Sequence, residues 1–263
     1  MKHILEREFL FQIVALILSF VVVHSVYIAI IRPNAEEVIA YEALMLEQGT
    51  PVDDRSAWVV LKDYEQETCF VLMFWALAIM TFKGSRIVAE RKLFDKALIP
   101  VTEGSKILSE DARQLARPIE ALPELSRDYL LPRVLSVALQ RLGSGSNIQE
   151  ISASIRDECD IESQRLDTEL SMIRYIAWAI PSIGFIGTVR GIGSALADAH
   201  EAISGNIAGV TASLGVAFNS TFIALLISIL IMFLSHQLTL QQERLVLSAQ
   251  RYCDKNLLRH IKA

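Results

Sequence analysis

Cysteine is scarce in this sequence, and the few that occur are widely spaced. Cys69, Cys159 and Cys253 are the three cysteines among 263 residues. They form no Cys-x-x-Cys pair, and no pair of histidines lies near them. An odd number of cysteines at this spacing argues against a disulfide framework and against a zinc site. Such cysteines usually act as small apolar residues that fill space where helices pack together. We therefore expect no metal site and no cofactor.

An excess of positive charge is also lacking. The chain has 25 Lys and Arg against 30 Asp and Glu, a net charge of −5, which argues against a nucleic-acid-binding surface. There is no Gly-x-x-x-x-Gly-Lys-Ser/Thr phosphate loop and no His-Glu-x-x-His motif, so neither ATP binding nor zinc proteolysis is indicated. None of the five histidines pairs with a candidate nucleophile. A membrane-embedded hydrolase is the enzyme alternative, and we expect the protein not to be an enzyme.

Apolar residues are what the sequence has in excess. They make up 52% of the chain, with a mean hydropathy of +0.37. A helix needs about 20 mostly apolar residues to cross a bilayer core about 30 Å thick. Four stretches approach or meet this requirement: residues 9–31, 68–82, 175–197 and 208–234. The first should end at Arg32-Pro33, since proline disfavours a continuing helix. The second is short, and an interfacial helix is its alternative interpretation.

Charge indicates how these spans are oriented. Basic residues near span ends tend to remain in the cytoplasm. They gather before the first span, after the second and after the fourth, whereas the segment between the first two spans is rich in acid. The basic residues are Lys2, Arg7, Lys83, Arg86, Arg91, Lys92, Arg244, Arg251, Lys255 and Arg259. We predict an all-α, multi-pass integral membrane protein. It has four transmembrane helices, long cytoplasmic helical extensions, and both termini in the cytoplasm.

The spans divide the chain into six parts. These are a first transmembrane helix in 1–32, an external acidic segment in 33–67, a second transmembrane helix in 68–82, a cytoplasmic helical region in 83–174, the third and fourth transmembrane helices in 175–236, and a cytoplasmic C-terminal helix in 237–263.

The cytoplasmic region should consist of short helices followed by a long one. Breaks are expected at Pro100, at Pro118 with Pro123, and at Pro132. Another break is expected at residues 143–146. Ser146 or Asn147 could then cap a helix that continues without interruption to residue 197. A tight turn at residues 204–206 would join this helix to the fourth span.

Small residues recur at helical spacing in the third and fourth spans. In the third, Gly184, Gly187 or Thr188, Gly191 and Ala195 share one face. In the fourth, Ser213, Ala217, Ser220 or Thr221, Ala224 and Ser228 form a similar stripe. Such residues let helices approach closely, and hydroxyls among them suit a narrow polar path. Plain helix packing is the alternative, which we favour for the glycines. Hydroxyls on both spans indicate a shared hydrated space, so we expect Thr188 and either Ser220 or Thr221 to face it.

The third span carries a recognisable motif. Pro181, Gly184, Gly187, Thr188, Val189 and Gly191 match the Pro-x-x-Gly-x-x-Gly-Thr-Val-x-Gly signature of the MotA/TolQ/ExbB proton channel family. Residues 213–225 resemble the last span of that family. Four spans with the N-terminus inside are closer to MotA than to the three-span TolQ and ExbB. The usual late proline of the last span is absent here, so whether Ser220 or Thr221 takes the family's hydroxyl role stays open.

The resemblance implies a channel or stator subunit of an ion-driven motor complex in the bacterial inner membrane. It implies a homopentamer around two copies of a single-span MotB/TolR/ExbD-like partner. Residues 175–236 would form the channel core, and Thr188 would line the path beside the partner's aspartate. Proton flow would drive mechanical work, although sodium remains an alternative. Pro181 and the small residues would line the channel or pack the helices.

The positions of acidic residues agree with a partner that supplies the acid. A proton relay inside a membrane uses Asp, Glu or His. No Asp or Glu lies in the middle of a span, and His24 belongs to the bulky first span. Arg190 should extend to the membrane surface. A structural or transport subunit of a membrane complex, without an ion path of its own, is the alternative function. It would explain the packing but would not require hydroxyls on both spans.

Overall fold

The computed structural model is helical, and the residues that it describes include four helices long and apolar enough to cross a membrane. It describes residues 2–48, 56–100, 106–203, 205 and 207–261. Within these residues no strand occurs beyond one isolated bridge between Ile107 and Ile261. The candidate spans are Glu8–Met45, Tyr64–Arg91, Ile148–Ala197 and Ala208–His260. The prediction of an all-α membrane protein with four spans is therefore confirmed. The second span, which was short in the sequence, lies within a 28-residue helix.

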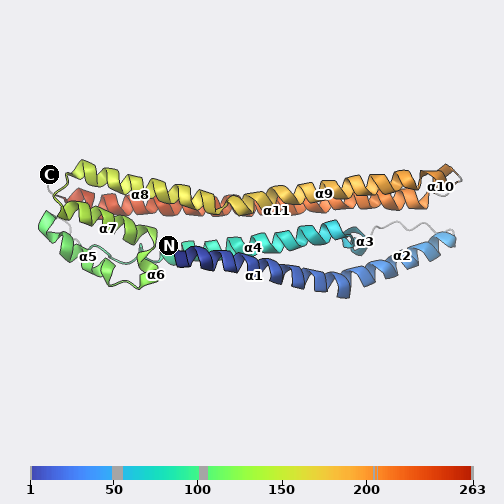
Figure 1. The fold of residues 1–263 in the computed structure, drawn as a ribbon, viewed down its shortest axis with the longest axis horizontal. Helices are drawn as coiled ribbons and strands as arrows, with labels where there is room; N and C mark the ends of the chain where they lie inside the picture. The colour runs from blue at the N-terminus through green and yellow to red at the C-terminus, as the bar shows by residue number, and fades with distance from the viewer. Residues whose placement is uncertain (1, 49–55, 101–105, 204, 206, 262–263) are drawn as a thin grey trace. The chain divides into compact units, whose positions relative to one another are not determined.

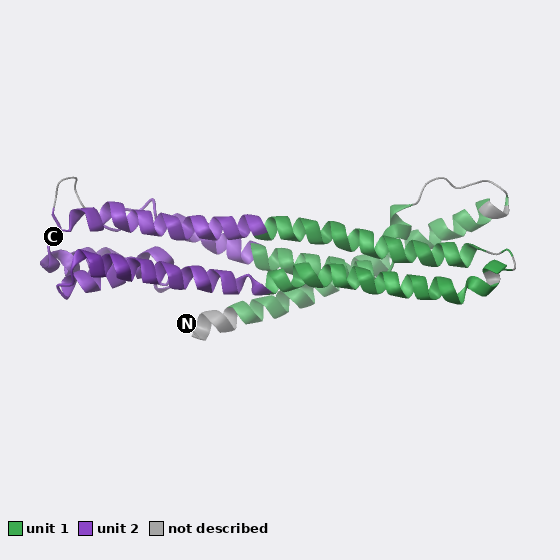
Figure 2. Ribbon diagram, turned by 90° about the horizontal axis from the view of Figure 1, so that it is seen from above, with its two compact units in different colours: residues 1–80, 172–235 green, residues 81–171, 236–263 purple. Residues whose placement is uncertain are grey.

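The chain divides into two compact units, coloured separately in Figure 2. The first unit comprises residues 1–80 and 172–235. Its helices, labelled in Figure 1, are α1 (Lys2–Val26), the π-helical turn η1 (Tyr27–Ile31), α2 (Arg32–Glu47), α3 (Ala57–Leu61), most of α4 (Tyr64–Arg91), α9 (Ser171–Ala197), α10 (Ala199–Ile203) and the first part of α11 (Ala208–Asn256). Many apolar side chains of α1, α9 and α11 are exposed, as expected for helices that face lipid or other membrane helices.

The helix of the first span does not end at Arg32-Pro33, so the predicted helix end was wrong. The chain stays helical from α1 through η1 into α2. Proline lacks an N–H and its ring crowds the carbonyl of the preceding turn. The wider π-helical turn directly before Pro33 accommodates this residue, as π-bulges do. The N–H of Arg32 reaches Tyr27 O, and Asn34 Nδ2 donates to Ile30 O at 2.6 Å. Residues 49–55 of the predicted acidic segment lie outside the described residues.

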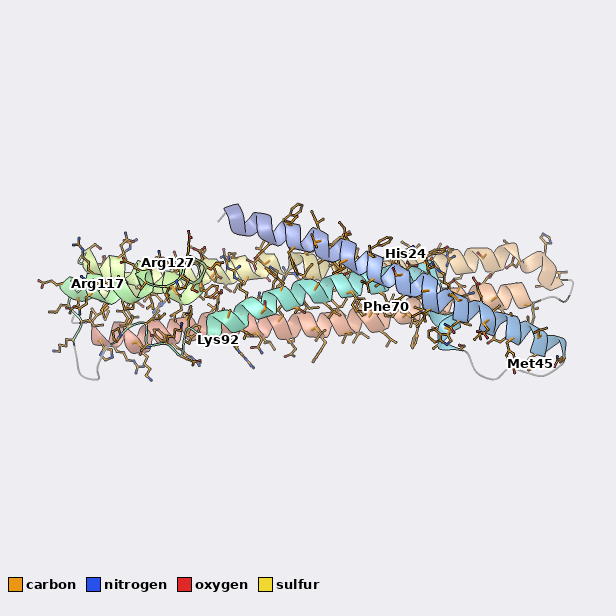
Figure 3. The ribbon with its side chains drawn as sticks, turned by 90° about the horizontal axis from the view of Figure 1, so that it is seen from below. His24, Met45, Phe70, Lys92, Arg117 and Arg127 are labelled. Atoms are coloured by element: carbon orange, nitrogen blue, oxygen red, sulfur yellow. The ribbon has the colours of Figure 1, made fainter. Side chains whose placement is uncertain are left out.

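The second unit, residues 81–171 and 236–263, has a core of its own. It comprises the ends of α4 and α11 together with η2 (Ser109–Asp111), α5 (Ala112–Glu120), α6 (Glu124–Arg127), α7 (Leu130–Gly143), α8 (Ile148–Glu169) and η3 (Leu258–His260). Leu131, Leu135 and Ile151 are at most 2% exposed in this core. Charged side chains such as Arg117 and Arg127 surround the helices of this unit in Figure 3.

Several predicted breaks in the second unit are confirmed, and others are displaced. Helix α7 ends at Gly143, and Asn147 caps α8 by accepting from the N–H of Glu150 at 2.8 Å. Pro118 lies inside α5 and Pro132 in the first turn of α7. A first-turn proline removes only an N–H that has no intrahelical partner. The helix expected to continue to residue 197 is interrupted at Leu170, whose N–H bonds Asp167 O three residues back.

Candidate functional site

Helices α9 and α11 approach each other along three buried glycines of α9. A Cβ atom placed on Gly184 would lie 2.5 Å from Ala224 Cβ, and one on Gly191 would lie 2.6 Å from Ala217 N. A Cβ atom placed on Gly187 would overlap the side chain of Ser220. These separations are too short for any side chain larger than hydrogen. The predicted small-residue stripes of the two spans thus face one another, and glycine allows backbone contact between them.

A pair of threonine hydroxyls lies within this contact. Thr188 Oγ1 and Thr221 Oγ1 are hydrogen-bonded to each other. Thr188 Oγ1 also lies 3.2 Å from Ala217 O, and Thr221 Oγ1 donates to Gly184 O at 3.1 Å. Both side chains are partly buried. The hydroxyls therefore bond across the two helices and also reach backbone carbonyls.

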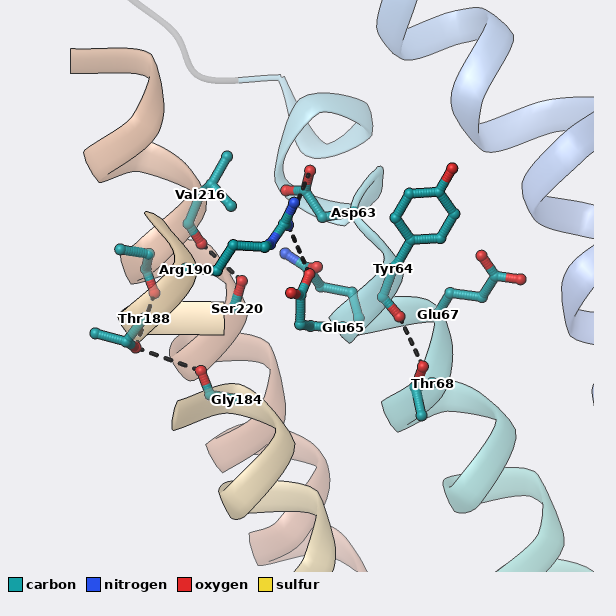
Figure 4. Close-up of polar contacts among 12 residues, drawn as sticks. Asp63, Tyr64, Glu65, Glu67, Thr68, Gly184, Thr188, Arg190, Val216 and Ser220 are labelled. Atoms are coloured by element: carbon teal, nitrogen blue, oxygen red, sulfur yellow. Dashed lines mark hydrogen bonds and ion pairs between the residues drawn. The ribbon is translucent and has the colours of Figure 1, made fainter. Parts of the chain in front are cut away.

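Ser220 is placed differently from Thr221. Its side chain is fully buried, and its hydroxyl donates to Val216 O of its own helix at 2.7 Å (Figure 4). Its Cβ and Oγ pack on Gly187. Of the two candidates that the sequence left open, Thr221 is the one whose hydroxyl bonds Thr188.

Pro181 leaves one backbone carbonyl of α9 without its usual donor. That carbonyl belongs to Ala177, four residues earlier, because proline has no N–H. Ser228 of α11 donates its hydroxyl to Ala177 O at 2.9 Å, and Ser228 is 2% exposed. A hydroxyl from the neighbouring helix thus replaces the missing backbone bond, in the way membrane helices compensate for proline. The sequence placed Ser228 in the small-residue stripe of the fourth span but did not pair it with Pro181.

Ser213 lies nearer the α10 end of the same helix pair. Its hydroxyl donates to Asp198 Oδ2 at 3.2 Å. A Cβ on Gly209 would lie 3.1 Å from the same carboxylate oxygen. Ser213 also approaches α9, because a Cβ on Gly191 would lie 2.7 Å from Ser213 O. This position therefore joins the two helices by a side-chain bond and by backbone contact.

Arg190, which the sequence predicts to extend to the membrane surface, is ion-paired in the structure. Its guanidinium donates to Glu65 Oε2 at 2.7 Å and lies 3.9 Å from Asp63 Oδ1 (Figure 4). The Glu65 side chain is 10% exposed. The Arg190 side chain is 47% exposed, and the ion pair joins α9 to α4. The physical signal was present in the sequence, since an arginine within an apolar span requires a partner. Periodicity alone did not identify which acid it is.

A second buried carboxylate follows two residues later in α4. Glu67 forms an ion pair with Arg32, and His24 Nδ1 lies 2.6 Å from Glu67 Oε1. Figure 3 shows His24 on α1 and Phe70 on α4. Sequence reasoning missed this pairing because it assigned Glu65 and Glu67 to a solvated external segment. In the structure both are buried in the first turn of α4.

Asp63 lies near the Arg190–Glu65 ion pair and also lines an open cavity. The cavity has a volume of about 720 Å³, and polar side chains of Glu42, Lys62, Asp63 and Asn219 contribute to its wall. Burial raises the pKa of Asp63 above its usual range, whereas Lys62 and Arg190 lower it and Glu65 raises it further. Among the described residues no cluster of three or more His, Cys, Asp or Glu could hold a metal ion.

Comparison with known proteins agrees with the motif in α9. Residues 126–251, just under half of the chain, match the model of the MotA/TolQ/ExbB proton channel family. This segment includes Pro181, the three glycines, and the Thr188–Thr221 pair. No curated protein and no solved structure matches the chain. The resemblance given by the sequence motif is therefore confirmed.

Proposed function

We propose that this chain, whose residues 126–251 match the model of the MotA/TolQ/ExbB proton channel family, is the channel subunit of an ion-driven motor complex. Five copies would surround a single-span partner that supplies an aspartate, in the bacterial inner membrane with both termini in the cytoplasm. Protons are the ion that the family description favours. The complex would convert their flow into mechanical work.

The hydrogen-bonded Thr188–Thr221 pair is the observation that carries this proposal. It lies at the glycine contact of two membrane helices and reaches two backbone carbonyls. Hydroxyls and carbonyls in a close helix contact are the groups that line narrow ion paths. The partner's aspartate would add the titratable group that α9 and α11 lack near this pair. Pro181 with Ser228, and the stripe Gly184, Gly187, Gly191, Ser213, Ala217 and Ala224, would hold the two helices in register.

Thr188→Val tests the proposal. Valine keeps the shape of threonine and removes the hydroxyl, so the complex should assemble while proton flux falls by about tenfold or more, as expected when a group in a proton path is removed. Flux is measured in vesicles containing the purified complex, with a potassium diffusion potential and a pH-sensitive dye. Thr68→Val is the matched control, because Thr68 is exposed and its hydroxyl bonds only Tyr64 O of its own helix.

Two results would count against the channel assignment. One is wild-type flux in the Thr188→Val complex, which would remove the hydroxyl from the path. The other is a wild-type complex that conducts no ions at all. The chain would then be better described as a structural or transport subunit, for which the close glycine packing of α9 on α11 is a sufficient explanation.

A further inference from the structure

The three helices α4, α9 and α11 meet at Gly187. A Cβ atom on this glycine would lie 2.5 Å from Ser220 Oγ and 3.1 Å from Glu65 Cγ. The carboxylate-bearing side chain of α4 and the hydroxyl of α11 thus flank one glycine. The next residue in each helix, Thr188 and Thr221, forms the hydroxyl pair. Glu65 is therefore a carboxylate of this chain that lies against Gly187, the residue before Thr188.

Polar groups connect Glu65 to the cavity described above. Arg190 bonds Glu65 and lies near Asp63, which lines the cavity wall. A cavity of about 720 Å³ with charged and amide side chains in its wall has room for several water molecules, since each occupies roughly 30 Å³ in the liquid. Water can therefore approach Asp63 from this side.

Two buried side-chain oxygen atoms near Asp63 lack a hydrogen-bond donor among the described residues. Asp63 Oδ2 and Gln66 Oε1 are buried and accept no hydrogen bond from the described residues. Gln66 is fully buried, and its amide lies beside the Asp63 carboxyl. Buried acceptors of this kind are satisfied by an internal water molecule or by a protonated group. Both alternatives suit a site that receives protons.

We propose that Glu65 is a proton acceptor of this chain itself, reached from the cavity at Asp63 and held by Arg190, on the path to the Thr188–Thr221 pair. This inference rests on the proposed channel function, and Glu65 is distinct from the acid that the partner would supply. A hydronium ion in the cavity gives its proton to the Glu65 carboxylate, which leaves water behind and weakens the bond to Arg190. Release of that proton by way of the hydroxyls to the partner's carboxylate restores the ion pair, so no other reactant is consumed. Asp63 would hold water, or the proton itself, at the cavity wall.

Glu65→Gln tests the proposal by removing the proton-binding group with little change in shape. The variant is purified with its single-span partner and assayed for proton flux in vesicles, as for Thr188→Val. Flux should fall by about a hundredfold, the scale expected for a positioned proton-transfer group. Glu67→Gln is the matched control, because Glu67 is an equally buried carboxylate of the same helix turn but bonds Arg32 and His24. It should keep flux within about twofold of the wild type, since it lies off the proposed path.

A double variant separates proton transfer from a purely structural ion pair. Glu65→Gln with Arg190→Gln removes both charges of this pair, so neither of the two residues is left as an unpaired charge. If Glu65 transfers protons, this variant assembles and still does not conduct. If the pair only holds α4 to α9, the second substitution restores flux, which overturns the proposal. Wild-type flux in Glu65→Gln, or an equal loss in Glu67→Gln, overturns it as well. A wild-type complex that conducts no protons would instead refute the channel function on which the inference rests.

Discussion

Several polar side chains of the first unit have an identifiable partner across a helix contact. Ser228 supplies the donor that Pro181 lacks, Thr188 bonds Thr221, and Arg190 bonds Glu65. In an apolar environment an unpaired polar group is costly, so such pairs specify how helices are placed beside one another. The same residues therefore position the candidate path and stabilise it.

Ser228→Ala should destabilise the protein because it removes the hydrogen bond to the carbonyl oxygen of Ala177. Without the hydroxyl, Ala177 O is left buried and without a donor, at a cost of about 1–3 kcal/mol. Thermal unfolding of the purified protein in detergent should shift to lower temperature. Ser182→Ala is the control, because Ser182 is exposed and bonds only Trp178 O of its own helix. Equal unfolding temperatures for the two variants would show that Ser228 does not compensate for Pro181.

At the level of elements, the glycines of α9 allow α9 and α11 to pack closely along their length. The glycines at 184, 187 and 191 meet Ala224, Ser220 and Ala217 in turn. A regular spacing on both helices is what allows a continuous close contact.

Gly191→Ala and Gly193→Ala should have opposite effects although they lie two residues apart. A methyl group on Gly191 would meet the backbone of Ala217 at 2.6 Å, whereas nothing lies within 4 Å of one on Gly193. The first should separate the helices and lower the unfolding temperature, with a loss of about 1–3 kcal/mol as is usual for overpacking. The second should be neutral or gain up to about 1 kcal/mol of helix propensity. Equivalent unfolding curves would contradict the close packing of this pair.

The sequence predicted these elements well where hydropathy or spacing decides the outcome. The four spans, the small-residue stripes and the Asn147 cap all follow from local patterns. The continuation of the helix through Pro33 could not be predicted from local patterns. The π-helical turn before Pro33 is a backbone adjustment, and no residue pattern marks it. The Arg190–Glu65 pair was also missed, because the two residues are 125 positions apart and only the tertiary fold brings them together.

At the scale of the whole molecule, the proposed function makes the chain one half of a channel site. Its α9–α11 pair offers hydroxyls and carbonyls, and Glu65, paired with Arg190, lies against Gly187 of α9. Exposed apolar residues of these helices, among them Phe185, Phe218 and Phe222, leave surface for further membrane helices. The proposed function fills that surface with other copies of the chain and with the partner.

The most direct test of the central claim is a cryo-electron microscopy structure of the purified complex with its single-span partner. The account predicts five copies of this chain around the partner, with a partner carboxylate close to the Thr188–Thr221 pair. A complex with no partner helix beside α9, or with Thr188 facing only lipid, would contradict it.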